Sequence, residues 1–369
     1  MERKYDVVIV GAGPNGLSAA IELARSNLSV LVLEAAPTAG GGARTQALTL
    51  PGFLHDVCSA VHPLGVASPF FRSLGLERYG LSWVHPSAPL AHVLDEDRVI
   101  MLERSVEATA KQFATDAAAY SDLVSPFVEG FDQLLPMILA PLSLPSHPLL
   151  MARFGGVALR SMTGLARSRF DGAEAAALLG AGSRLPPSYR ARLERFRYGP
   201  GVFKIDWALS APIPWRNPGC ARAATVHLSG ALPEMAKAQQ LPSNGKFAER
   251  PFTLLVQPTL FDETRAPAAM HTAWAYCHVP AGSPLDATDA IEEQVERFAP
   301  GFRRQILAKS AKNALEMQRY NANYVGGDIN GGMANLAQLF FRPAPRVDPY
   351  STPATDIFLC SSSTPPGGG

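Results

Sequence analysis

The clearest pattern of apolar and polar positions in the chain lies between Tyr5 and Glu34. A short apolar run from Val7 to Val10 is typical of a buried strand. A second apolar run, Ser29 to Leu33, closes the segment. Between the two runs, apolar residues recur at helical spacing and predict a helix with one apolar face: Leu17, Ala20, Ile21 and Ala24. The pattern therefore predicts strand, tight turn, helix and strand.

The turn of this unit carries three glycines in a G-x-G-x-x-G pattern, Gly11, Gly13 and Gly16. Gly11 allows a sharp turn, Gly13 lets a pyrophosphate approach the backbone, and Gly16 lets the helix pack closely on the strand. The helix begins near Pro14, where its N-terminus presents N–H groups and a positive dipole end to phosphates. The spacing favours a dinucleotide site, although an ordinary glycine-rich turn is the alternative.

An acidic residue stands where such a site needs one. Glu34 lies 23 residues after Gly11, close to the roughly 20 expected for the acid that accepts a ribose hydroxyl. A carboxylate at this position repels a 2′-phosphate, so the sequence disfavours NADP.

The loop after the second strand is also rich in glycine. Gly40, Gly41 and Gly42 precede Arg44. Glycines let backbone amides approach a pyrophosphate, and an arginine can pair with its oxygens. Because this loop of a nucleotide fold lies beside the cofactor, cofactor contact is favoured over an ordinary surface loop.

These residues carry a resemblance to a known family. Glu34-Ala35, the glycine pair and Arg44-Thr45 resemble the second motif of FAD-dependent oxidoreductases of the phytoene desaturase and amine oxidase type, with two extra small residues before Arg44. Later segments resemble the branch called phytoene dehydrogenase-related, or pyridine nucleotide-disulfide oxidoreductase domain-containing protein 2. The resemblance implies an FAD cofactor, an apolar small-molecule substrate oxidised at C–H bonds, and these cofactor-binding residues: Gly11, Gly13, Pro14, Gly16, Glu34, Ala35, Gly41, Gly42 and Arg44.

The resemblance also implies an α/β fold, with a Rossmann-type FAD/NAD(P)-binding domain, a mixed-sheet substrate domain and a helical insert. Short apolar runs predict a hairpin at 90–94 and 98–102, and further strands at 203–209, 225–228, 252–257 and 271–279. Residues 105–131 and 152–179 have helical spacing, and Asp289 is expected to cap a helix carrying Ile291, Val295 and Phe298. The predicted domains are 1–85 with 346–369 for FAD, 86–185 for the hairpin and helical insert, and 186–345 for substrate.

Two parts of the family pattern are not matched. An internal stretch expected near Ala181 is missing, and the chain stops at Gly369, before an expected helix facing the flavin. One alternative is therefore a truncated, non-catalytic relative, or a gene fragment, that acts through protein contacts. Another alternative is an NAD-only dehydrogenase.

Composition limits the remaining possibilities. Lys+Arg 33 against Asp+Glu 32 gives no reason to expect nucleic acid as a partner. Four widely spaced cysteines, Cys58, Cys220, Cys277 and Cys360, favour buried reduced thiols over a disulfide framework or zinc site. No apolar run spans a membrane and no targeting peptide precedes the first strand, so we expect a cytoplasmic protein, or a mitochondrial one if the source is eukaryotic. Arginines on the helical insert form a solvated face or a peripheral membrane patch: Arg160, Arg167 and Arg169.

No catalytic residue and no metal site stand out. His55, Asp56 and His62 are interpreted as hydrogen-bonding loop residues rather than metal ligands. Tyr324, Asp328 and Asn330 lie in a glycine-rich loop that, by the resemblance, approaches the active site, although turn chemistry alone accounts for Asp and Asn there. The substrate, electron acceptor and oligomeric state are not determined by the sequence.

Overall fold

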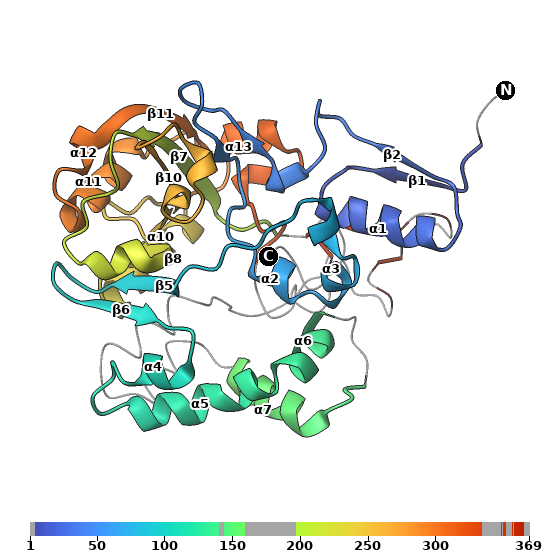
Figure 1. The fold of residues 1–369 in the computed structure, drawn as a ribbon, viewed down its shortest axis with the longest axis horizontal. Coiled ribbons are helices and arrows are strands. Elements are labelled where there is room, and N and C mark those ends of the chain that lie inside the picture. The colour runs from blue at the N-terminus through green and yellow to red at the C-terminus, as the bar shows by residue number, and fades with distance from the viewer. Residues whose placement is uncertain are drawn as a thin grey trace.

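A computed structural model describes residues 4–139, 144–158, 197–333, 348, 350, 351, 356 and 358–364. Figure 1 shows a small unit of two strands and a helix on one side, a large sheet on the other, and a group of helices below them. Within the described ranges, every helix is too short or too polar to cross a membrane.

The small unit is the predicted N-terminal one. Strand β1 (Val7–Val10) pairs in parallel with β2 (Val30–Leu33), and α1 (Pro14–Arg25) connects them. The expectation of a buried strand is wrong, however, because Val8 is 53% and Val10 82% exposed. Helix α1 packs on the face that carries Ile9, and the described part of this sheet contains only β1 and β2. The opposite face is therefore left open to solvent.

The large sheet has seven strands in the order β11-β7-β10-β9-β8-β5-β6. Only β5 and β8 pair in parallel, so the sheet is mixed, as predicted. The predicted hairpin forms β5 and β6 and joins this sheet, while the division of the chain into domains stays a prediction. The strands are β5 (Ala88–Val93), β6 (Val99–Leu102), β7 (Gly201–Leu209), β8 (Ala223–Leu228), β9 (Thr253–Val256), β10 (His271–Val279) and β11 (Ile306–Lys312).

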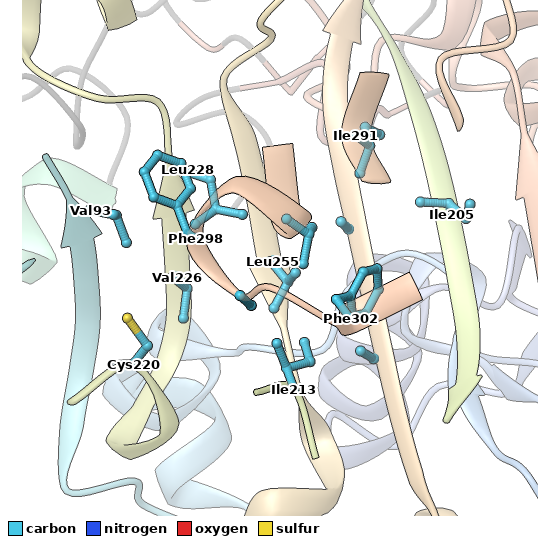
Figure 2. Close-up of a cluster of buried hydrophobic side chains, with 14 of the residues drawn as sticks. Val93, Ile205, Ile213, Cys220, Val226, Leu228, Leu255, Ile291, Phe298 and Phe302 are labelled. Atoms are coloured by element: carbon cyan, nitrogen blue, oxygen red, sulfur yellow. The ribbon is translucent and has the colours of Figure 1, made fainter. Parts of the chain in front are cut away.

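One face of this sheet carries the main apolar core. Helices α11 (Thr288–Phe298) and α12 (Phe302–Gln305) pack against it, and Figure 2 shows Leu255, Phe298 and Phe302 among the buried side chains. The predicted apolar stripe of α11 is confirmed. The predicted cap is wrong, since α11 begins one residue before Asp289 and Asp286 instead accepts a hydrogen bond from the Thr288 N–H at 2.8 Å.

The central strand β7 corrects a second expectation. Its pattern predicts a half-buried strand with Lys204 and Asp206 facing water, yet all nine residues are buried. Phe203, Ile205 and Trp207 face the core, and the two ionisable side chains are buried on the other face. The reason is that this second face is also covered, in part by the segment around His55.

The helices below the sheet are more broken than predicted. Residues 105–131, expected to be helical throughout, form two main helices, α4 (Val106–Ala110) and α5 (Ala117–Glu129). Residues 159–179, with Arg160, Arg167 and Arg169, and the junction near Ala181 lie outside the described residues. The remaining elements are β3 (Thr45–Gln46), β4 (His55–Asp56), α2 (Pro63–Ala67), α3 (Pro69–Ser73), α6 (Phe131–Leu139), α7 (Pro148–Ala158), α10 (Leu232–Ser243) and α13 (Ala314–Tyr320).

Candidate functional site

The glycine-rich turn has the geometry that the motif requires. Gly11 has φ of +103° and donates its N–H to the Leu33 carbonyl at 2.7 Å, which ties the turn to β2. A Cβ on Gly16 would lie 2.0 Å from the Gly11 carbonyl oxygen, so only glycine allows α1 to approach β1 this closely. A Cβ on Gly13 would meet only the Gly41 Cα, at an ordinary 3.8 Å. The backbone of the second glycine loop therefore lies against Gly13 at van der Waals distance.

The N-terminus of α1 is available to an anion. No side chain caps the helix at Gly13, Pro14 occupies the first turn, and that turn contains no acidic residue. Unpaired N–H groups and the positive end of a twelve-residue helix together favour a phosphate.

Glu34 organises the turn from the end of β2. Its carboxylate accepts N–H hydrogen bonds from Ala36 at 2.9 Å and from Ala12 at 2.7 Å, and these bonds lower the pKa of Glu34. The side chain is exposed, so each oxygen can accept a further hydrogen bond. Glu34 and its neighbour Ala35 are thus placed where a ribose can be met, but that role stays a prediction.

The second glycine loop lies directly on the first. The Gly40 N–H donates to the Ala12 carbonyl at 2.8 Å, and a Cβ on Gly41 would lie 3.0 Å from the Gly13 Cα. Arg44 is fixed beside this contact, because its Nε donates to the Gly41 carbonyl at 2.9 Å and its guanidinium lies 4.7 Å from the Tyr320 ring centroid. The structure therefore brings all of the predicted cofactor residues into one cradle.

A buried ionic cluster lies on the second face of the large sheet. The Lys204 Nζ is 2.5 Å from Asp206 Oδ1, and His55 Nδ1 is 3.7 Å from the same oxygen. Burial lowers the pKa of Lys204 and raises that of Asp206, and contact between the two opposes both shifts. Burial and the nearby Lys204 lower the pKa of His55 to about 4, so its imidazole is neutral at pH 7.

The loop between Gly42 and Ser59 connects the cradle to this cluster. The Ser59 N–H donates to the Gly42 carbonyl at 3.0 Å, and a Cβ on Gly42 would collide with the Tyr324 hydroxyl. Cys58 lies beside Gly42 and Tyr324. Burial raises the pKa of both the Cys58 thiol and the Tyr324 phenol. Gly42 is therefore required for close packing, in addition to its predicted role at the cofactor.

The other residues singled out from the sequence mostly form hydrogen bonds within the fold. Asp56 accepts hydrogen bonds from Arg265 at 2.6 Å and from Thr45 at 2.6 Å, and His55 is bonded to Thr49, as the hydrogen-bonding interpretation expects. Asp328 is buried and accepts three backbone N–H groups, two from its own turn and one from Gly199, so it ties that turn to the chain just before β7. Asn330 is exposed.

The sequence interpretation missed Lys204 and Asp206. Two ionisable residues that alternate with Phe203, Ile205 and Trp207 indicate a solvent face, which is the usual meaning of such a pattern. The resemblance to an enzyme with a ligand beside this sheet was the one indication that the face could be interior. Of the four cysteines, Cys220 and Cys277 are buried as expected, while Cys360 is exposed.

Comparisons with known proteins agree with this geometry. Residues 9–74 match the family model of the NAD(P)-binding Rossmann-like domain. The chain is 27% identical over 206 residues to pyridine nucleotide-disulfide oxidoreductase domain-containing protein 2 of Rattus norvegicus, covering 50% of this chain and 35% of the relative. It is 29% identical over 138 residues to one of the subunits of limonene dehydrogenase from Castellaniella defragrans, covering 36% of this chain and 25% of the relative.

Among solved structures, an oxidoreductase from Methanosarcina mazei is 13% identical with a TM-score of 0.46, covering 95% of this chain and 93% of that one. The matched region spans about a third or less of the length of the curated relatives named here. The chain therefore carries an NAD(P)-binding Rossmann-like domain. It is distantly homologous to pyridine nucleotide-disulfide oxidoreductase domain-containing protein 2, which confirms the resemblance drawn from its residues.

Proposed function

We propose that the protein is an FAD-dependent oxidoreductase, with the ADP half of FAD held in the cradle and the buried ionic cluster lying toward the reacting end. The observation that carries the proposal is the uncapped N-terminus of α1, at the point where the two glycine loops meet through Gly13 and Gly41. The same cradle is joined through Gly42 and Cys58 to a sheet face bearing buried charges. A cofactor that is long enough to run from a phosphate site to a reaction site suits this arrangement.

Each part of the cradle has a proposed role in binding FAD. The α1 N-terminus and Gly13 bind the pyrophosphate, Glu34 accepts a ribose hydroxyl, and Arg44 presents further guanidinium N–H groups beside the glycine loops. FAD, when bound, supplies the chemistry by accepting a hydride or two electrons from a substrate C–H bond. Pro14, Gly16, Ala35, Gly41 and Gly42 shape the backbone around it.

The choice of FAD over NAD rests on the second glycine loop. An NAD site needs the first turn and the acid, both of which are present, but does not need a second loop seated on the first. Glu34 is ionised at pH 7, since hydrogen bonds lower its pKa, and it therefore opposes the 2′-phosphate of NADP. The finer proposal is an apolar substrate, which the name of the relative limonene dehydrogenase supports.

Thermal melting and visible absorbance test the proposal together. FAD is expected to raise the melting temperature and to give the protein the absorbance of bound flavin, because a ligand that binds only the native state stabilises it. Stabilisation by NAD but not by FAD would favour a dehydrogenase instead. A colourless protein that FAD neither colours nor stabilises would favour the non-catalytic relative, an alternative that the exposed face of β1 also supports.

A further inference from the structure

The second face of the seven-stranded sheet has a chemistry of its own beside the ionic cluster. Strand register places Trp274 opposite Asp206 and Lys312 opposite Lys204, so side chains from three strands share this face. Lys204 Nζ lies 5.2 Å from the centroid of the Trp274 ring. Thr272 follows on the same side of β10. We call these five residues the polar face.

Several polar atoms on and beside the polar face have no hydrogen-bond partner among the described residues. They are Trp274 Nε1, Thr272 Oγ1 and, from the covering segment, His55 Nδ1, in residues that are 4%, 1% and 1% exposed. Buried polar groups in folded proteins are normally hydrogen-bonded, so a cluster of exceptions needs an explanation. A ligand that supplies the missing partners is one.

Lys312 adds a charge that the chain does not balance. Its side chain is half-buried, and within the described part of the chain it makes no hydrogen bond and no ion pair. Two carboxylates of this region are already engaged, Asp206 by Lys204 at 2.5 Å and Asp56 by Arg265 at 2.6 Å. Lys312 therefore contributes a positive charge to the polar face without an ion pair of its own among the described residues.

The unused groups specify the ligand's chemistry. An ammonium and an indole N–H can only donate, and the hydroxyl and the imidazole can also donate. A complementary ligand must present acceptor oxygens and a negative charge. A carboxylate has both in one group, and its two oxygens can accept from two donors at once.

We propose that the polar face binds the carboxylate of an otherwise apolar substrate, with Lys312 as its charge partner and Trp274 Nε1 as a hydrogen-bond donor. The proposal rests on the proposed function in placing the substrate at this sheet. It changes the expected substrate class from a plain hydrocarbon to an organic acid with an apolar body. The pyrimidine edge of a flavin is also rich in acceptors, so the experiment must separate the two sources.

Equilibrium binding of benzoate and of benzyl alcohol, with and without FAD, tests the proposal. The two probes share a ring and differ in charge, so benzoate is expected to raise the melting temperature of the wild-type protein while benzyl alcohol does not. Lys312→Gln is expected to weaken benzoate binding by about tenfold or more, as for loss of a charge-assisted hydrogen bond. Trp274→Phe keeps the ring, removes one donor, and is expected to weaken binding by a smaller factor.

Lys309→Gln is the matched control. Lys309 lies on the same strand but opposite Trp207 on the core face, where it pairs with Glu292 at 2.9 Å. Equal effects of the two lysine variants on benzoate, or no benzoate binding by the wild type, would overturn the proposal. A Lys312→Gln variant that loses only FAD affinity would also overturn it, because the cation would then serve the cofactor. Benzoate binding without FAD binding would support the site and contradict the proposed function alone.

Discussion

The β1–β2 sheet and the seven-stranded sheet are both built from apolar strands, yet they are buried to very different degrees. Strand β7 is covered on both faces along its whole length, whereas β1 leaves Val10 82% exposed. The large sheet has its own core beneath α11 and α12 (Figure 2), while the described β1–β2 sheet has α1 on one side only. The difference indicates that the large sheet is stabilised by its own packing. The stability of the unit formed by β1, α1 and β2 depends more on what binds to it.

The largest expected effect is a loss of packing in the large sheet. Trp207 is fully buried, with its ring edge-on to Phe302 at 5.1 Å between centroids. Trp207→Ala is expected to lower the free energy of unfolding by about 4 kcal/mol, through lost burial and a residual cavity. Val10→Ala in β1 is the control and should change it by less than about 0.5 kcal/mol. Urea denaturation measures both, and equal effects would remove the contrast between the sheets.

The next effect concerns the buried pair on β7. Lys204→Met is expected to destabilise the protein by about 3 kcal/mol, because it leaves Asp206 buried without its partner. The double variant Lys204→Met with Asp206→Leu removes both charges and should recover most of that loss. Urea denaturation of the two single variants and the double variant gives the interaction energy between Lys204 and Asp206. Simple additivity of the two substitutions would show that the groups do not interact as the structure has them.

A smaller and pH-dependent effect comes from His92 and His227, which face each other in the paired strands β5 and β8. Burial lowers the pKa of His92 to about 4 and that of His227 to about 3. Both values lie below the ordinary 6.5, so the unfolded chain takes up protons first as the pH falls. Their contribution to the free energy of unfolding is full above about pH 6.5 and is lost progressively as the pH falls toward the folded-state pKa values.

His227→Leu should flatten this dependence of the unfolding free energy between about pH 6.5 and pH 4. His85→Leu changes an exposed histidine and serves as the control. An unchanged pH profile in His227→Leu would contradict the assignment of acid sensitivity to this pair.

The smallest expected effect sharpens the comparison by restoring the weaker unit. FAD at about a hundred times its dissociation constant should add about 2.7 kcal/mol to native stability. Amide hydrogen exchange should slow most in β1, α1 and β2 and least in β7, where burial is already complete. Uniform slowing of exchange in both sheets would argue that FAD does not bind at the nucleotide unit in particular.

Much of the fold could be predicted, because several elements have a local sequence pattern that is typical of only one structure. The glycine turn, α1, β2 and the strands at 225–228 and 271–279 follow from periodicity and motif spacing. Strand β11, whose alternation is weak, was not predicted, and neither was the capping box of α13 at Asn313 and Glu316. Burial of Lys204 and Asp206 could not be predicted, since a strand's own sequence does not state what covers its second face.

The candidate site divides in the same way. The cradle residues are adjacent in sequence, so spacing alone could identify them. The polar face joins β7, β10 and β11 and lies beside His55 of β4, and only the folded chain brings these elements together. Asp328 shows the converse, because its carboxylate accepts backbone N–H groups from its own turn and from Gly199.

The central claim is that the turn at Gly13 and the N-terminus of α1 hold the pyrophosphate of FAD. Its most direct test is an FAD titration of Gly13→Trp, followed by flavin fluorescence, with Gly156→Trp as control. A side chain at Gly13 enters the proposed phosphate space, whereas a Cβ at Gly156 meets nothing within 4 Å. The account predicts that Gly13→Trp loses FAD binding while Gly156→Trp keeps it. Undiminished FAD affinity in a folded Gly13→Trp variant would contradict the account.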